Sequence, residues 1–168
     1  MFSEQDLLEA TKTFFAAFAE DSNSLFLLQY FSTTKPVIIQ HAPATCPRPQ
    51  TSRLAGIAAV RSYFDLLSTY FSRSKVQLQE LPQVDVEARR VELEASAVWK
   101  WKTSGRSWTE DFSWALEYDE KLKITSFIVT TTSEPTTCAM RAVDRAPVTH
   151  TKVVLPVNYQ GSLVKLVE

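Results

Sequence analysis

The chain of 168 residues is long enough for one domain with a sizeable core, because a chain of this length buries roughly 70% of the surface that it exposes when unfolded. A hydrophobic fraction of 45% with 22% charged residues excludes a disordered chain. The formal net charge of -1 excludes a strong electrostatic preference for nucleic acid or an anionic membrane surface. Only 3 glycines accompany 10 phenylalanines, 5 tyrosines and 4 tryptophans, an aromatic excess that the rest of the sequence must account for.

The first residues lack the basic segment and the apolar run of a secretory signal, and no stretch approaches the ~18 consecutive apolar residues of a membrane span. Cys46 and Cys138 are far apart and show no zinc-binding spacing. Spacing alone does not decide whether they pair, and we treat both as free thiols. We therefore expect a cytoplasmic protein that holds no metal.

Two helices are predicted at the start of the chain. Residues 6–19 place apolar side chains on one stripe at helical spacing, and Ser3 is a suitable cap before them. The polar residues 21–24 favour a turn and the N-cap of a second helix, which we expect over residues 25–30.

A strand, a loop and a long helix follow. Pro36 ends helical structure, and a strand starts at Val37. Residues 41–53 contain three prolines and form a loop of about 12 residues, a length that is often functional. Apolar residues then recur every three or four positions over residues 54–71, which predicts the clearest amphipathic helix of the chain.

After residue 74 the hydrophobic pattern changes to period two, which indicates strands. Ser104 and Gly105 favour a hairpin turn between two of them. The predicted order is α-α-β-α-β-β-β-β, an α+β architecture with an antiparallel meander. The four strands after the long helix are expected near residues 76–86, where alternation appears at 76–78 and 84–86, and near residues 91–101, 108–118 and 122–132.

The end of the chain differs in kind. We assign residues 1–146 to the domain and residues 147–168 to a C-terminal extension. The extension has strand-like runs at 152–155 and 163–167, so it adds an edge strand, crosses to a partner subunit or is partly disordered.

Three patterns carry a family resemblance: the opening helix at 13–21, Val-Ile-Ile-Gln-His-Ala-Pro at 37–43, and the start of the long helix at 54–64. Together with the element order, they resemble the SnoaL-like branch of the nuclear transport factor two-like superfamily over roughly residues 5–132. The resemblance implies a cone-like, curved antiparallel sheet with a mixed edge, wrapped around a long helix. It also implies a conical cavity and a homodimer.

His41 is the first candidate catalytic residue. In the isomerases, cyclases and dehydratases that the chain resembles, the end of the first strand carries an acid, a base or a hydrogen-bonding residue, and His41 occupies this position. A histidine with its ordinary pKa near 6.5 transfers protons readily at neutral pH. The alternative is that His41 only hydrogen-bonds the adjoining loop.

Glu110 and Asp111 are the second candidates. Strict alternation puts Glu110 on the same face as the tryptophans and the phenylalanine around it, where burial would raise its pKa and make it a usable acid. Asp111 then faces the other way, yet it lies closer to the position where the resembling enzymes carry a pocket Asp or Asn. A bulge near Glu110 would reconcile the two patterns. The alternative is a solvent-facing pair opposite lysines of the neighbouring strand.

The aromatic residues form the third candidate group. Each one by itself is best explained as part of the core, but together the tryptophans on adjacent strands suit the wall of an apolar cavity. The two interpretations, a filled core and a ligand-binding wall, remain open at this point. The residues concerned are Phe15, Phe18, Phe64, Trp99, Trp108, Phe112 and Trp114.

No phosphate loop, nucleotide fingerprint, H-E-x-x-H or G-x-S-x-G motif is present, so we expect chemistry without a cofactor. The resemblance implies an isomerase, cyclase or dehydratase that acts on a hydrophobic polyketide-, terpenoid- or steroid-like small molecule. His41 would be the base, and Glu110 or Asp111 the acid or hydrogen-bond donor. The alternatives are a domain that binds a small ligand without turnover and a dimerising interaction domain.

Overall fold

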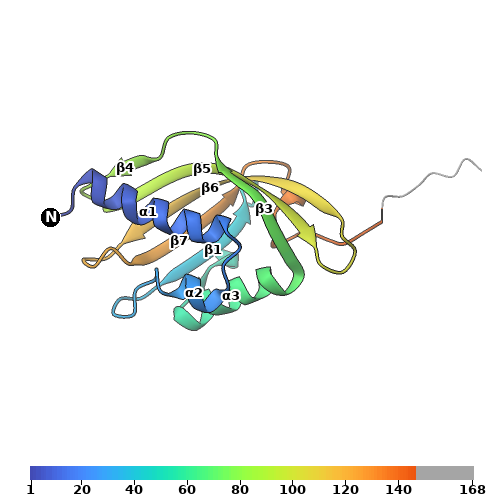
Figure 1. Ribbon diagram of the computed structural model, residues 1–168, viewed down its shortest axis with the longest axis horizontal. Coiled ribbons are helices and arrows are strands. Elements are labelled where there is room, and N and C mark those ends of the chain that lie inside the picture. The colour runs from blue at the N-terminus through green and yellow to red at the C-terminus, as the bar shows by residue number, and fades with distance from the viewer. Residues whose placement is uncertain (147–168) are drawn as a thin grey trace, which may run out of the picture.

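The computed structural model describes residues 1–146, which fold into three helices and a seven-stranded sheet that bends around α1 and α3 (Figure 1). The predicted α+β class is confirmed. The runs at 152–155 and 163–167 lie outside the described residues. The helices are α1 Glu4–Ala19, α2 Ser24–Leu28 and α3 Ile57–Tyr70; the strands are β1 Ile38–Pro43, β2 Leu54–Ala55, β3 Phe71–Leu78, β4 Gln83–Asp85, β5 Arg90–Trp101, β6 Ser107–Tyr118 and β7 Ile124–Thr131.

The first two helices begin where the sequence places caps. Ser3 and Asp6 form a reciprocal capping box at α1: the Ser3 Oγ accepts from the Asp6 amide and the Asp6 carboxylate accepts from the Ser3 amide. Asn23 caps α2 by accepting from the amide of Phe26. No helix within residues 1–146 has the length and apolar character needed to span a membrane.

The long helix starts three residues later than its hydrophobic pattern predicts. Leu54 and Ala55 instead form the short strand β2, paired with β1. Gly56 follows with φ 97°, a left-handed conformation that glycine adopts without a steric penalty, and α3 begins at Ile57. Leu54 and Ala55 are both exposed in β2, so their apolar character is not a sign of burial on a helix face, and hydrophobic periodicity alone did not separate the strand from the helix.

The strand order is β2-β1-β7-β6-β5-β3, with β4 paired to β5. All pairs are antiparallel except β1 with β7, where His41 lies opposite Val129. The β5–β6 register runs without a shift past Glu110, which lies opposite Ala97. Because no bulge interrupts β6 there, side chains alternate strictly between the two faces of the strand.

Aromatic rings fill the interior between the helices and the sheet. Trp114 is 1% exposed, and its ring centroid lies 4.8–5.3 Å from those of Phe14, Phe18 and Phe127. Phe64 of α3 stacks on Phe127 at 6.2 Å. Such pairs stabilise by about 0.5–1.5 kcal/mol each beyond the burial of their surface. The space that a conical cavity would occupy is therefore packed with side chains of the protein.

Arg73 of β3 ties the C-terminal end of α1 to the sheet. Its guanidinium is 2% exposed and donates to the backbone carbonyls of Phe18, at 2.6 Å, and Ser22, at 3.3 Å. It forms an ion pair with Asp21 at 3.1 Å and lies 4.1 Å from the centroid of the Phe18 ring. A buried cation with these four interactions fixes the position of α1, which carries much of the aromatic core.

We expect Arg73→Ala to lower the free energy of unfolding by about 3 kcal/mol, because two buried carbonyls lose their donor and the cation–π contact is lost. Arg61→Ala is the matched control, since Arg61 forms only an exposed pair with Asp65 at 3.5 Å and its loss should cost less than about 1 kcal/mol. Urea unfolding of the two variants measures the difference. Equal losses would contradict the role given to Arg73.

Candidate functional site

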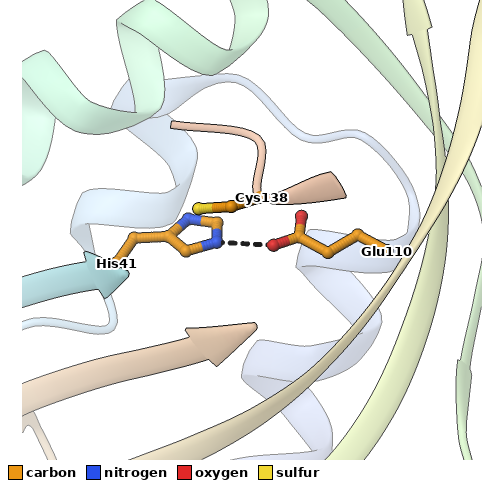
Figure 2. Close-up of side chains that lie close together, drawn as sticks. All are labelled: His41, Glu110 and Cys138. Carbon is orange, nitrogen blue, oxygen red and sulfur yellow. Dashed lines mark hydrogen bonds and ion pairs between the residues drawn. The ribbon is translucent and has the colours of Figure 1, made fainter. Parts of the chain in front are cut away.

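Three chemically active side chains from distant parts of the chain meet inside the domain (Figure 2). His41 lies near the end of β1, Glu110 lies on β6, and Cys138 follows the 3-10 turn Pro135–Thr137 after β7. All three are buried, and their ligand atoms lie within 4.8 Å of one another. The parallel pairing of β1 with β7 brings His41 to this place, because it sets the end of β1 next to the end of β7.

The carboxylate of Glu110 is completely buried and accepts four hydrogen bonds. Oε1 lies 2.8 Å from His41 Nε2 and accepts from Thr131 Oγ1 at 2.6 Å. Oε2 accepts from Trp99 Nε1 at 2.8 Å and from the amide of Ala139 at 3.3 Å. Both oxygens are thus saturated, which compensates for the loss of water around the charge.

The imidazole of His41 bridges Glu110 and Tyr63. Its Nε2 faces Glu110 and its Nδ1 lies 2.9 Å from the Tyr63 hydroxyl. Burial alone would lower the pKa of His41, but the hydrogen bonds and charges of Cys138 and Glu110 outweigh it and raise this pKa to about 9. At neutral pH the ring is therefore an imidazolium that donates from both nitrogens.

Tyr63 lies on α3 and extends the hydrogen-bonded chain away from Glu110. Burial, together with the nearby Glu110 carboxylate, raises the pKa of Tyr63 well above its usual range, so its hydroxyl stays protonated. Since the imidazolium donates to the Tyr63 oxygen, the hydroxyl proton of Tyr63 is available to another acceptor. The arrangement ends in one polarised O–H donor.

A cavity of about 220 Å³ opens beside this donor. His41 and Tyr63 form its polar inner wall, and Ile39, Leu54 and Met140 give it an apolar lining. Its volume lies below the ~300–1,000 Å³ of pockets that enclose whole drug-sized ligands. It therefore accepts a small molecule, or one end of a larger molecule. The lining residues are Ile39, Gln40, His41, Ser52, Leu54, Tyr63, Met140 and Arg141.

The structure brings His41 and Glu110 together and places Asp111 elsewhere. Asp111 lies on the opposite face of β6, where its carboxylate accepts from Gln79 Nε2 at 3.0 Å on the exposed side of the sheet. Because adjacent residues of a regular strand face opposite sides, Asp111 must face away from the interior when Glu110 faces into it.

None of the seven aromatic residues predicted to bind a ligand lines the cavity beside His41. Five of them are fully buried in the core, and Phe15 and Trp108 are half-buried against it. Trp99 contributes to the site in another way, because its indole nitrogen donates to Glu110. The core residues are Phe18, Phe64, Trp99, Phe112 and Trp114.

Sequence reasoning missed Tyr63, Thr131 and Cys138. A signal for Tyr63 was present, since it lies three residues after Val60 and four before Leu67 on the buried stripe of α3. A hydroxyl on such a stripe needs a buried partner. Thr131 and Cys138 carry no comparable signal, because their partners come from distant segments.

The same cluster supplies atoms that bind metal ions in other proteins. However, ligands about 2.1 Å from a tetrahedral metal lie roughly 3.4 Å apart, whereas His41 Nε2 and Glu110 Oε1 are 2.8 Å apart and already hydrogen-bonded. Both atoms would have to separate to admit an ion.

Although burial opposes the charge of Cys138, the neighbouring His41 lowers the pKa of this thiol.

A search against protein-family sequence models finds no match, and neither does a search against curated proteins. Solved structures do match. AusH from Aspergillus nidulans superposes with a TM-score of 0.61 at 15% sequence identity. The superposition covers 78% of this chain and 86% of the AusH chain. The BvnE pinacolase from Penicillium brevicompactum gives a TM-score of 0.61 at 13% sequence identity. This superposition covers 76% of this chain and 86% of the BvnE chain.

The chain therefore shares the fold of these solved structures, a curved sheet that bends around helices. At this level of identity the likeness extends to the architecture. The chemistry must be argued from the residues of this chain.

We expect the ring of His41 to titrate near pH 9 in the folded protein, compared with 6.5 when unfolded. Because the pKa of His41 is higher in the folded than in the unfolded protein, the charged ring stabilises the folded state. This contribution is fully present below pH 6.5 and is lost as the pH rises through 9. Glu110→Gln should lower the pKa of His41 and flatten the fall in stability over this range. NMR titration of the ring and urea unfolding across this pH range measure the two effects.

Asp111→Asn is the matched control for Glu110→Gln, since it neutralises the adjacent carboxylate on the other face of β6. It should leave the pKa of His41 unchanged. A His41 ring that titrates near 6.5 in the unaltered protein would contradict the charged pair.

Proposed function

We propose that the chain catalyses cofactor-free proton transfer to a carbonyl oxygen of a small apolar molecule, as in an isomerase or cyclase. The observation that carries this proposal is the buried hydrogen-bonded row Glu110–His41–Tyr63, which ends at the wall of a cavity. A donor that is fixed in a dry, apolar environment stabilises developing negative charge on oxygen more strongly than water does.

The proton moves along this row in a defined direction. The Tyr63 hydroxyl gives its proton to the oxygen of the bound molecule while His41 Nδ1 gives its proton to the Tyr63 oxygen, so Tyr63 remains neutral. The product of this step is a neutral imidazole. Water at the solvent side of the cavity takes the α-proton from the protonated carbonyl compound, which gives the enol. When the enol returns to the ketone, its carbon takes a proton back from solvent and its hydroxyl proton returns through Tyr63 to the imidazole, so His41 acts as acid and base in turn.

Glu110 is a positioning residue in this scheme, because it touches His41 and does not line the cavity. Its carboxylate holds the ring orientation through Nε2 and stabilises the imidazolium form. Thr131 and Trp99 in turn hold the carboxylate. A donor row in which each member is held by a neighbour needs little reorganisation during proton transfer.

The apolar lining and the shared fold support a hydrophobic substrate. Ile39, Leu54 and Met140 offer aliphatic surface to a polyketide-, terpenoid- or steroid-like molecule, of which one end enters the cavity. The BvnE structure, which shares the fold, is described as a pinacolase. A non-catalytic ligand-binding domain is the second candidate function, and the filled aromatic interior favours it because the cavity beside His41 is small.

The test is exchange of the α-protons of small cyclic ketones in heavy water, followed by NMR. We expect exchange above the uncatalysed rate, and we expect Tyr63→Phe and His41→Ala to reduce kcat/KM by at least about 100-fold, a typical loss for a general acid–base group. Tyr118→Phe is the matched control, since it also removes a buried hydroxyl. That hydroxyl forms a 2.7 Å hydrogen bond with Thr11 and does not line the cavity beside His41. It should leave exchange unchanged.

Two results would overturn the catalytic proposal. Ketones that bind without exchange would identify a binding domain, and exchange that persists in Tyr63→Phe would remove the donor row from the mechanism. Folding of each variant is checked by its thermal unfolding.

A further inference from the structure

The wall of the cavity has a second polar end, made by arginine. Arg141 lines the cavity together with Gln40 and Ser52. Gln40 in turn accepts a hydrogen bond from Arg53 Nε at 3.2 Å. Two guanidinium groups therefore lie close to the apolar lining, on the side that leads to solvent, since both arginines are exposed whereas His41 and Tyr63 are buried.

Neither of these arginines has a carboxylate partner among the residues that the structure describes. Five other arginines of the described part of the chain do form ion pairs: Arg61, Arg73, Arg89, Arg90 and Arg106. Within residues 1–146, the side-chain partner of Arg141 is the Cys46 sulfur, a weak acceptor that lies 3.3 Å from Nη2 of Arg141. Its capacity to bind an anion is thus unused.

The sequence around the cavity explains the lack of partners. Residues 36–64, which supply β1, β2 and most of the lining, contain no Asp or Glu. Residues 138–143, which supply Met140 and Arg141, contain none either. The one carboxylate behind this wall is Glu110, which is buried and held by four donors. In a chain of net charge -1, this cavity is locally positive.

We infer that the ligand of this cavity is an apolar molecule that carries an anionic group, a carboxylate or a phosphate, which Arg141 binds at the solvent side while the apolar body extends towards Tyr63. A guanidinium matches the paired oxygens of either group with two parallel hydrogen bonds. This inference rests on the proposed function, because it orients a carbonyl of the same molecule towards the donor row. Arg53 adds positive charge through its contact with Gln40.

The test compares binding of phenylacetate with its uncharged counterpart phenylacetamide, by calorimetry at low salt. We expect phenylacetate to bind the unaltered protein at least tenfold more tightly. Arg141→Gln should abolish this preference, and Arg141→Lys should retain part of it. Arg145→Gln is the matched control, since it removes an exposed arginine four residues along that does not line the cavity.

Phenyl phosphate in the same assay distinguishes the two anionic groups: the group that Arg141 serves is the one whose binding weakens more in Arg141→Gln. Raising the salt concentration tenfold should reduce the preference, because an exposed ion pair is screened.

Equal binding of acid and amide, no binding of the acid, or a preference that survives Arg141→Gln would each overturn the inference. Failure here is distinguishable from failure of the proposed function. Exchange in the neutral cyclic ketones depends on Tyr63 and does not require an anionic group, whereas the binding comparison requires no turnover.

Discussion

A completely buried carboxylate is the constraint on which the rest of this structure depends. Removing an ionised group from water costs several kcal/mol unless it is paired and hydrogen-bonded. Glu110 meets this condition with donors from β1, β5, β7 and the segment after β7. These four donors come from four separate segments of the chain, so residues that neighbour one another in sequence do not supply them. The strand order and the return of the chain after β7 are therefore also the arrangement that satisfies one charge.

The aromatic core and the donor row support one another. Trp99 belongs to both, since its ring packs against Phe71 at 5.8 Å while its nitrogen holds Glu110. Tyr63 likewise packs on Phe64 at 5.1 Å and bonds His41. Close packing restricts these side chains to single rotamers, so the polar atoms are fixed by apolar contacts. The rings that fill the interior also leave the cavity beside β1, where Arg53 and Arg141 have no carboxylate partner within residues 1–146.

Local patterns predicted most of the elements because each pattern reflects one element alone. The period of two in β6 favoured Glu110 inward, although a possible bulge left Asp111 open, and the apolar stripe predicted α3. The start of α3 was wrong, since Gly56 and the pairing of β2 with β1 take over at its predicted first turn. Register and pairing involve two segments at once, so a single stretch of sequence contains no direct signal for them.

The sequence by itself determined the α+β class, most of the strands and helices, and the candidates for chemistry, which were His41 and the adjacent carboxylates Glu110 and Asp111. Only the tertiary structure decided that His41 meets Glu110, that Tyr63 continues their row, and that the aromatic rings form a filled core. The physical reason is the range of the interactions. Periodicity arises from neighbours along the chain, whereas the charge of Glu110 is stabilised by residues up to 69 positions away.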